Sequence, residues 1–247
     1  MALATGIEWT DATWNPVSGC TKITRGCDHC YAERFAERFR GTTAHPFENG
    51  FDLTLRPHKL NEPLAWRAPK RIFVNSMSDL FHKEIPHPFV DRVFDVMEQA
   101  NWHVFQILTK RSSLMRRYVN ERYAEGNAPA HIWLGVSIED RSALVRLEHL
   151  KQTRAYIRFV SFEPLLEGLP SLDLAGIRWA IAGGESGPQA RPVLYDWVRS
   201  IRDQCRAQSV AFFFKQWGGR TPKAGGNRLD GRRWQQYPTT AKPLASA

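Results

Sequence analysis

The sequence predicts an α/β fold, in which parallel strands alternate with helices in a full or partial TIM-like barrel. Three observations lead to this fold class. Short apolar runs recur along the chain, helical periodicity fills the segments between them, and 247 residues suit one domain of this kind. Strands and helices that alternate singly form a parallel sheet with right-handed crossovers, either closed as a barrel or partly open.

Six short runs have the composition of strands buried in a parallel sheet. Each is apolar or β-branched over four or five residues. They cover residues 72–75, 104–108, 132–136, 157–160, 179–182 and 211–214. Nearer the N-terminus, residues 8–16 and 52–55 are expected to supply two more strands, which gives about eight strand–helix units.

Apolar residues at helical spacing lie between these runs and predict helices that pack on the sheet. The first helix is expected over residues 28–40, with Tyr31, Phe35 and Phe39 on one face. Cys205 follows Ile201 on the apolar face of a later helix, so we expect a buried structural thiol there. The periodic positions of the remaining helices are Val90, Val93, Phe94 and Met97; Leu144, Leu147 and Leu150; and Leu194, Trp197, Val198 and Ile201.

The chain is expected to form one barrel domain over residues 1–218, with an N-terminal cysteine loop, and a C-terminal tail over residues 219–247. After Gly218 the sequence becomes polar and glycine-rich, which is typical of a tail rather than of a second core. Leu229 and Trp234 are the apolar residues expected to anchor this tail on or near the barrel mouth.

The composition is that of a folded globular protein with a net positive charge. With 43% hydrophobic and 24% charged residues, the chain is expected to fold around a packed core. No apolar run approaches the roughly 20 residues that span a bilayer, and the sequence does not open with a basic segment followed by an apolar one. We therefore expect a cytoplasmic protein with no membrane segment. The formal charge of +9 favours a polyanionic partner such as nucleic acid.

Three of the four cysteines lie close together, as Cys20, Cys27 and Cys30. In a reducing compartment this grouping indicates a metal centre rather than a disulfide. Three thiolates suit a 4Fe-4S cluster, because each binds one iron and the fourth iron stays open for another ligand. The alternative is a structural zinc site in which His29 serves as the fourth ligand.

Polar side chains follow the predicted strands at the ends where a parallel barrel builds its active site. Many are of the types that also cap helices, so we expect about half of them to have structural roles. The glutamates are harder to explain structurally, because a carboxylate in a barrel mouth needs a cation or a hydroxyl group to balance it. The set comprises Asn75, Ser76, Ser78, Asp79, Thr109, Lys110, Arg111, Ser137, Glu139, Ser161, Glu163, Glu185, Ser186, Lys215 and Gln216.

A glycine-rich turn, residues 183–187, follows the strand predicted at 179–182. Its exposed backbone amides and single carboxylate suit an amino-acid moiety or a ribose, although such a turn is also typical of a simple tight loop. Lys110 and Lys215 are basic groups at strand ends that can bind a substrate phosphate, a cofactor carboxylate or an internal glutamate.

With the cysteines in an N-terminal loop of such a barrel, the chain resembles the radical S-adenosylmethionine proteins, whose usual spacing is C-x3-C-x2-C, whereas six residues fill the first gap here. The closer resemblance, over nearly the whole length, is to a phage-associated "three-Cys-motif" family of radical-SAM-like proteins. Its pattern appears at residues 9–16, 20–30, 75–80, 162–164, 183–186, 215–217 and 229–231. The resemblance implies a barrel of the radical-SAM type. It also implies a cluster that chelates the amino and carboxylate groups of S-adenosylmethionine and reduces it to methionine and a 5′-deoxyadenosyl radical.

The leading hypothesis is therefore a radical S-adenosylmethionine enzyme that acts on a nucleic-acid or nucleotide substrate, in DNA modification or repair. Its expected partners are nucleic acid, DNA rather than RNA, and an electron donor such as flavodoxin or ferredoxin. The hypothesis assigns Cys20, Cys27 and Cys30 to the 4Fe-4S cluster, Glu163, Lys110 and Lys215 to catalysis, and Asn75, Ser76, Ser78, Asp79, Ser137, Glu139, Gly183, Gly184, Glu185 and Ser186 to S-adenosylmethionine.

Two alternatives come from other functional classes. One is a zinc-stabilised nucleic-acid-binding protein without catalysis, which needs only the cysteine loop, His29 and a basic surface. The other is a hydrolase that uses the strand-end carboxylates, with the cysteines in a structural role. The sequence leaves the reacting bond and the oligomeric state open.

Overall fold

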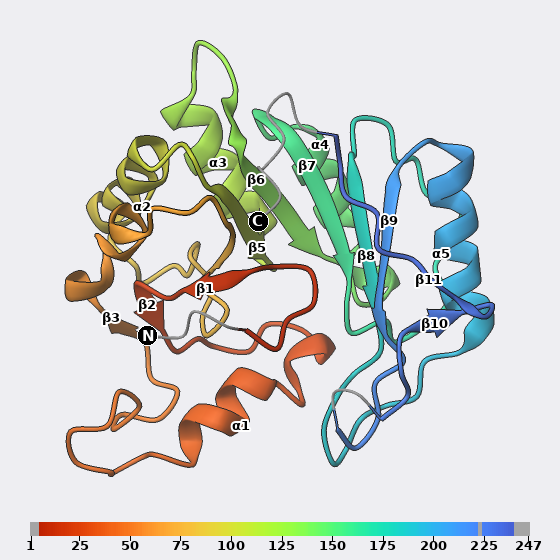
Figure 1. Cartoon of the computed structure of the whole chain (residues 1–247), viewed down its shortest axis with the longest axis horizontal. Helices are drawn as coiled ribbons and strands as arrows, with labels where there is room; N and C mark the ends of the chain where they lie inside the picture. Colours follow the sequence, from red (N-terminus) through yellow and green to blue (C-terminus); the bar gives the residue numbers. More distant parts are fainter. Residues whose placement is uncertain (1–4, 222–223, 240–247) are drawn as a thin grey trace.

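A computed structural model describes residues 5–221 and 224–239 and shows a seven-stranded parallel sheet curled into a half-barrel (Figure 1). The strand order is β1-β4-β5-β6-β7-β8-β9, and every neighbouring pair is parallel. The strands are β1 (Ala12–Trp14), β4 (Arg71–Val74), β5 (Val104–Thr109), β6 (Ala128–Ser137), β7 (Ala155–Phe162), β8 (Trp179–Gly183) and β9 (Ala211–Gln216). The predicted class, a partial TIM-like α/β barrel, is confirmed.

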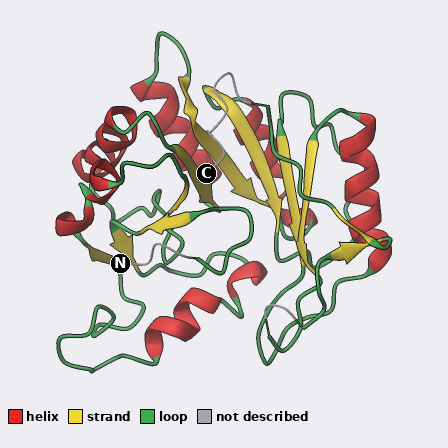
Figure 2. Cartoon of the chain, in the orientation of Figure 1, coloured by secondary structure: helices red, strands yellow, loops and turns green. Residues whose placement is uncertain are grey.

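Four helices cover the convex side of the sheet, as Figure 2 shows. They are α2 (His87–Gln99), α3 (Ser112–Arg122), α4 (Val145–Lys151) and α5 (Tyr195–Ala207), while α1 (Tyr31–Glu37) stands apart beside the carboxyl ends of the strands. Single turns of 3-10 helix occur at Arg25–Cys27, Pro57–Lys59, Glu62–Ala65 and Arg141–Ala143. Across the part of the chain that the structure describes, no helix has the length and apolar character to cross a membrane.

The expectation of eight strand–helix units is wrong, because residues 52–55 do not join the main sheet. Only Thr54–Leu55 forms a strand, β3, and it pairs antiparallel with β2 (Val17–Ser18). A two-residue pairing beside the cysteine loop cannot bridge the gap between the edge strands β1 and β9. The half-barrel is therefore open on that side.

The first helix is shorter than predicted and does not pack its aromatic residues on the sheet. Residues 28–30 are not helical, so α1 begins at Tyr31 instead of residue 28, and it ends at Glu37. Tyr31 and Phe35 are half exposed, and Phe35 contacts Phe39 and Phe47 in a small cluster of its own. Helical periodicity identified one aromatic face but could not tell which partner covers it.

Alternate residues of each strand pack in two separate cores. Ile72 and Val74 of β4 face the helices and pack with residues such as Phe94 of α2. Phe73, between them, faces the concave side, where it contacts Trp9 at a ring-centroid distance of 4.6 Å. The concave core is mainly aromatic and comprises Trp9, Phe73, Val104, Trp133, Ile157, Phe159, Trp179, Ile181 and Phe213.

The described part of the tail runs along the outer edge of β9. Leu229 and Trp234 are buried there, and β10 (Arg228–Leu229) pairs with β11 (Arg232–Arg233). The backbone N–H of Phe214 donates to the carbonyl of Trp234 at 2.8 Å, which extends the pairing at this edge. The last part of the predicted tail, residues 240–247, lies outside the described residues.

Cys205 is fully buried on α5, as the sequence predicts. Burial raises the pKa of its thiol to about 12, so it stays protonated at neutral pH. It packs as a small apolar group, well separated in the fold from the other three cysteines.

Candidate functional site: a polar concave mouth beneath a cysteine loop

The concave face changes from aromatic to polar along each strand. On the concave side of β6, Trp133 comes first and Ser137 ends the strand. On the concave side of β7, Phe159 is followed by Ser161. Gly135 has no side chain because the Phe159 ring covers it, and a Cβ there would lie 2.5 Å from a ring carbon. The aromatic floor therefore closes the amino end, and a polar layer lines the carboxyl end, where parallel barrels carry their active sites.

Several buried polar atoms of this face have no hydrogen-bond partner among the described residues. They are both side-chain atoms of Asn75, Oε1 of Gln106, Oγ of Ser161 and, deeper, Nε1 of Trp9. Strand alternation places Gln106 and Ser161 on the concave side. Because buried polar groups in folded proteins are almost always paired, these atoms need partners that the described residues do not supply.

The cysteine loop lies over this mouth and packs closely against the end of β6. A Cβ on Gly26 would lie 2.4 Å from Cγ of Glu139, so only glycine allows this approach. At the other end of the loop, the backbone N–H of Gly19 donates to the carbonyl of Met77 at 2.9 Å. Cys27 Sγ lies 3.9 Å from Thr24 Oγ1, and Cys30 directly precedes α1.

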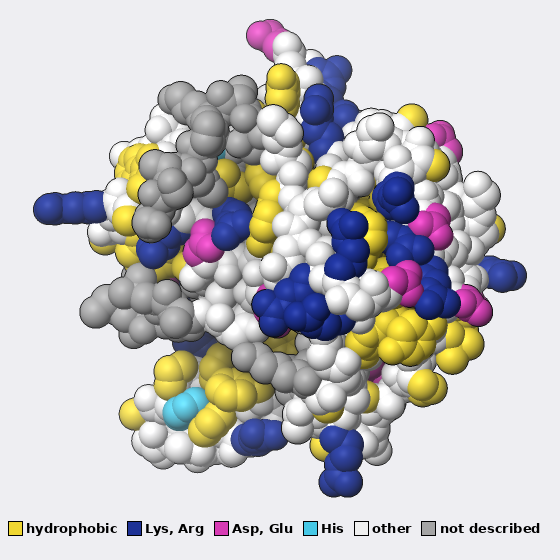
Figure 3. Space-filling model, turned by 45° about the vertical axis from the view of Figure 1, so that its right-hand side comes forward, with side chains coloured by type: hydrophobic (Ala, Val, Ile, Leu, Met, Phe, Trp, Pro, Cys, Tyr) yellow, Lys and Arg dark blue, Asp and Glu magenta, His cyan; other side chains and the backbone are white. Residues whose placement is uncertain are grey.

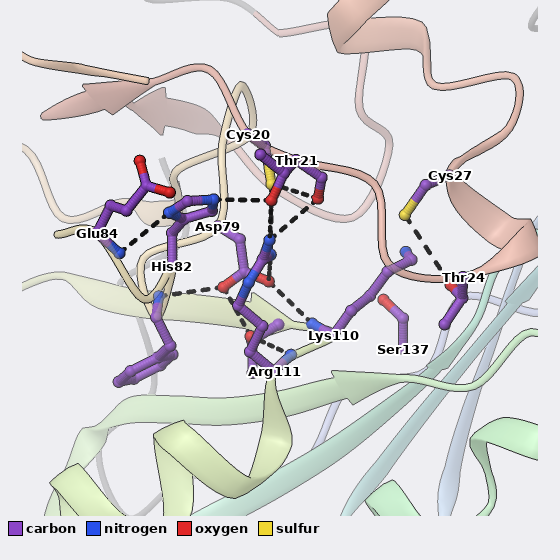
Figure 4. Close-up of polar contacts among 12 residues, drawn as sticks. Cys20, Thr21, Thr24, Cys27, Asp79, His82, Glu84, Lys110, Arg111 and Ser137 are labelled. Atoms are coloured by element: carbon purple, nitrogen blue, oxygen red, sulfur yellow. Dashed lines mark hydrogen bonds and ion pairs between the residues drawn. The ribbon is translucent and has the colours of Figure 1, made fainter. Parts of the chain in front are cut away.

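Arg111 ties the loop to the sheet, as Figure 4 shows. Its Nη1 donates to Cys20 Sγ at 3.3 Å and to Asp79 Oδ2 at 3.1 Å. Its Nη2 donates to the Thr21 carbonyl and hydroxyl, each at 3.0 Å. The Thr21 hydroxyl also lies 2.9 Å from Nε2 of His82. One guanidinium thus fixes the first cysteine relative to the end of β5.

Asp79 forms an ion pair with Arg111. Its carboxylate also accepts hydrogen bonds from the Thr109 hydroxyl at 2.7 Å and from the backbone N–H of Lys110 at 3.1 Å. All of its oxygens are therefore committed inside the protein. Asp79 is placed to position Arg111 and the cysteine loop, and in this structure it does not present a free carboxylate to the concave space.

Lys110 and Glu139 form an ion pair beneath the loop, with Nζ and Oε1 2.9 Å apart. Nη1 of Arg146 approaches the other oxygen of the same carboxylate at 2.8 Å. Burial opposes the positive charge of Lys110, but the Glu139 carboxylate and the nearby Cys27 thiol together hold its pKa above the ordinary value. Figure 4 places Lys110 beside Ser137 and below Cys27.

A second pair, Lys215 on β9 and Glu163 after β7, joins the opposite side of the mouth through a short hydrogen bond. Strand alternation places Lys215 on the same face as Phe213. Gly183 lies next to this pair, since a Cβ there would be 3.4 Å from the Glu163 carboxyl carbon. All three predicted catalytic residues thus lie at the mouth, each neutralised by an internal partner.

The glycine-rich turn after β8 is fixed to the cysteine loop. Arg191 pairs with Glu185 at 2.6 Å, and Nδ1 of His29 lies 2.9 Å from the same carboxylate. Burial raises the pKa of Glu185, but the Arg191 and His29 contacts outweigh it and lower that pKa below its usual value. Glu185 therefore bridges the turn and the segment between Cys27 and Cys30.

The other residues of the predicted cofactor set have local partners. Ser76 donates to Asn15 Oδ1 at 3.2 Å and Ser78 to the Val17 carbonyl at 3.0 Å, so both shape the turn after β4. Ser186 Oγ accepts a hydrogen bond from the Gln216 amide. Gly184 allows the backbone of Trp217 to approach, because a Cβ there would lie 2.0 Å from its carbonyl oxygen.

Burial raises the pKa values of the Cys20 and Cys30 thiols above the ordinary thiol value. Arg111 opposes this effect at Cys20, and the backbone N–H groups of Glu33 and Ala32 oppose it at Cys30. Without a metal both thiols are therefore protonated at neutral pH. Binding a soft metal there requires two thiol protons to leave.

The loop supplies the donor atoms that a 4Fe-4S cluster uses, three thiols on one segment. Within residues 5–221 and 224–239, no three His, Cys, Asp or Glu side chains converge closely enough to hold one metal ion. A zinc site would need its thiolates about 2.3 Å from one point. A four-iron cluster instead binds each thiolate at a separate iron, and the loop supplies three such thiols above unpartnered polar atoms.

Arg146 and Arg191 contribute to the mouth, and Gln106 lies below it in register with Phe73 and Trp133, but none of the three stands out in the sequence as a site residue. Gln106 has a local signal, since it is the single amide in the otherwise apolar run 104–108. The two arginines have none, because they follow Glu139 and Glu185 at spacings of 7 and 6 residues, which predict no contact. Arg111 belongs to the strand-end set, but its contact with Cys20 cannot be read from spacing.

Fold and site together define a partial TIM-like α/β barrel protein with a three-cysteine loop over its carboxyl-terminal mouth. The chain belongs to the family described as "Protein of unknown function (DUF5131)", whose model matches residues 4–238. No curated protein matches the chain. Among solved structures it is similar to a spore photoproduct lyase complexed with dinucleoside spore photoproduct, at a TM-score of 0.36 and 11% identity. That likeness covers 76% of this chain and 59% of the lyase chain, so this chain spans less than two thirds of it.

Proposed function

We propose that the chain is a radical S-adenosylmethionine enzyme whose cluster is held by Cys20, Cys27 and Cys30. The observation that carries this proposal is the loop of three thiols, which packs against Glu139 at the polar end of the concave face, the end where Ser137 and Ser161 lie. When bound and reduced, a 4Fe-4S cluster with an open iron supplies the electron that cleaves S-adenosylmethionine into methionine and a 5′-deoxyadenosyl radical.

The residues of the mouth would bind and orient this cosubstrate. Asn75, with both amide atoms unpaired, and Ser161, with a free hydroxyl, offer donors and acceptors to its polar groups. Ser137 and Gly183 end their strands on the same concave face, and Gly183 lies against the Glu163 carboxyl group. The aromatic floor excludes water from below, which protects a reactive intermediate.

The paired residues of the mouth have a different role in this proposal. Glu139 and Glu185 support the cysteine loop through Gly26 and His29. Lys215 and Glu163 form the pair that faces the interior from β9 and β7, so either can hold or deliver a proton at the substrate. Lys110, which pairs with Glu139 near Cys27, would place a positive charge beside an anionic cluster.

We infer that the substrate is a nucleic acid or nucleotide, with DNA favoured over RNA. The net charge is +9, and Lys and Arg side chains are spread over the face seen in Figure 3. Exposed apolar residues gather at the mouth end, on the cysteine loop, α1 and the start of α5. They are Ile23, Tyr31, Phe35, Leu194 and Tyr195, five of the eight large hydrophobic residues that the described residues expose. Aromatic rings beside basic groups suit stacking on unpaired bases.

The test is anaerobic reconstitution of the full chain with iron and sulfide, followed by electron paramagnetic resonance with and without S-adenosylmethionine. We expect a reduced-cluster signal that shifts on adding S-adenosylmethionine and is lost when Cys20, Cys27 and Cys30 are changed to Ala. Cys205→Ala is the matched control and keeps the signal, because this thiol is buried away from the loop. A reducing partner such as flavodoxin or ferredoxin should replace the chemical reductant.

The His29→Ala variant separates this proposal from a zinc site. The His29 ring is held by Glu185, so its loss should loosen the loop but leave the iron bound. A colourless protein that holds one zinc, and loses it in His29→Ala, would overturn the radical mechanism. Turnover of substrate without reductant or S-adenosylmethionine would instead favour a hydrolase.

A further inference from the structure

A second candidate site lies at the opposite end of the half-barrel from the cysteine loop. It is a cavity of about 900 Å³ at the amino ends of β7, β8 and β9, lined in part by Tyr156, Arg158, Gly176, Arg178 and Arg206. The eight residues of β7 at about 3.3 Å each separate it from the polar mouth by roughly 25 Å. It is therefore distinct from the candidate site for S-adenosylmethionine.

The cavity concentrates positive charge without a paired carboxylate. Arg158, Arg178 and Arg206 all line it, and none of its lining residues is Asp or Glu. Among residues 5–221 and 224–239, no carboxylate forms an ion pair with any of the three. Arg158 is half buried, and its Nε donates only to the Thr153 carbonyl, at 2.8 Å. The arginines of the polar mouth, in contrast, each pair with a glutamate or aspartate.

The pKa of Arg158 reflects its half-buried position near like charges, without a paired carboxylate in the described part of the chain. Burial and the nearby Arg178 guanidinium together lower the pKa of Arg158 below its ordinary value. The arginine nevertheless stays charged at any physiological pH. A group of like charges around a cavity is stabilised when a multivalent anion binds between them.

An aromatic side chain stands beside the arginines. Tyr156 is 52% exposed, and the Arg178 guanidinium lies 5.7 Å from its ring centroid. Tyr237 forms another part of the wall and packs on Trp179 below the barrel floor. A planar base can stack on an exposed tyrosine while its phosphates reach guanidinium groups.

We propose that this cavity binds a nucleoside polyphosphate. Arg158, Arg178 and Arg206 hold the phosphate chain, and Tyr156 stacks on the base. The volume suits a ligand of this size, since small-molecule sites measure about 300–1,000 Å³. The proposal is independent of the radical mechanism, because no residue of the cavity belongs to the cysteine loop or to the polar mouth.

Isothermal titration calorimetry of the full chain with ATP, without magnesium, tests the site. Excess S-adenosylmethionine is included so that the adenine of ATP does not report on the concave mouth. We expect binding that weakens at least about tenfold in Arg158→Gln/Arg178→Gln, since each lost charge-assisted hydrogen bond is worth about that factor. Arg117→Gln, on an exposed arginine of α3, is the matched control and should bind ATP normally.

Two further titrations separate the base from the phosphates. Tyr156→Ala should weaken the binding of ATP and leave the binding of inorganic triphosphate unchanged. Arg158→Lys keeps the charge but loses the planar fork, so its affinity for ATP should fall between those of the wild type and Arg158→Gln. Circular dichroism melting of each variant shows whether it is folded. Equal affinity for ATP in the wild type and in Arg158→Gln/Arg178→Gln would overturn the site. Equal affinity for ATP and triphosphate would overturn its nucleoside specificity.

Discussion

Arg111 donates a hydrogen bond from Nη1 to the sulfur of Cys20 at 3.3 Å, and the same nitrogen contacts Asp79. The contact joins a cysteine of the N-terminal loop to a residue just after β5, 91 positions along the chain. A cationic donor on a cluster thiolate stabilises the reduced state more than the oxidised one, since the reduced cluster carries more negative charge.

We therefore expect Arg111→Gln to lower the reduction potential of the reconstituted cluster, on the order of 50 mV, since a tenfold change in the relative stability of the two oxidation states corresponds to about 59 mV. A potentiometric titration followed by electron paramagnetic resonance measures the shift. Arg111→Lys, which keeps the charge beside Asp79, should recover part of it, and Arg117→Gln should leave the potential unchanged. Full iron loading with the wild-type potential in Arg111→Gln would show that the contact does not tune the cluster.

Gly26→Ala should impair metal loading through a steric effect alone. The new Cβ would meet Cγ of Glu139 at 2.4 Å, so the loop must lift or the Glu139 ion pairs must open, at a cost of about 1–3 kcal/mol. Iron per chain after reconstitution, with a denaturation curve for each variant, measures both effects. Gly126→Ala is the matched control, because nothing lies within 4 Å of its Cβ position. Equal iron content in the two variants would contradict the packing of the loop on β6.

Ser161→Ala should change the stability and S-adenosylmethionine binding in opposite directions. The hydroxyl is buried without a partner, so removing it should leave the free protein equally stable or more stable, by up to about 1 kcal/mol. Loss of this hydroxyl should weaken the binding of S-adenosylmethionine by about tenfold. Urea unfolding and calorimetric titration give the two numbers, with the exposed Ser113→Ala as control. Unchanged affinity would remove Ser161 from the binding site.

His103 should make the fold less stable in mild acid. Burial lowers the pKa of its ring, and Nδ1 accepts a hydrogen bond from the Lys70 N–H while Nε2 faces the Pro63 carbonyl, which requires the neutral form. The unfolded chain takes up the proton first, so stability holds above about pH 6.5 and falls below it, by at most about 1.4 kcal/mol per pH unit, until the folded pKa is passed.

Urea unfolding between pH 5 and 8 checks this dependence. His103→Gln can accept from Lys70 and donate to Pro63 without titrating, so its stability should fall less between pH 7 and 5 than that of the wild type. His58→Gln, at an exposed histidine, is the matched control. Parallel pH profiles for the wild type and His103→Gln would contradict the assignment.

The sheet was largely predictable because its strands are buried on both faces. Runs such as 179–182 and 211–214 are apolar without interruption, and they form β8 and β9 within a few residues of the predicted bounds. The N-terminal part was less predictable. Residues 52–55 have a strand-like composition, but their partner is a two-residue strand beside the cysteine loop, and local sequence does not specify that choice.

The positions of the site residues were predictable, whereas their roles were not. Residues after parallel strands meet at one edge, so the amino-acid sequence is enough to place Lys110, Glu139, Glu163 and Lys215 at the mouth. Their pairing depends on side chains that approach across the barrel. The ion pair of Lys215 with Glu163 joins strands that lie two positions apart in the sheet, and no sequence spacing encodes it.

The sequence by itself determined the strand–helix alternation, the grouping of three thiols and the polar strand ends, because each is a local pattern of residue types. Only the tertiary structure decided that the barrel stays half open, that Arg111 reaches Cys20, and that Asn75 and Ser161 remain unpartnered among the described residues. These properties depend on distances between segments far apart in the chain. Such distances are set when the two cores pack together, and residue order alone does not fix them.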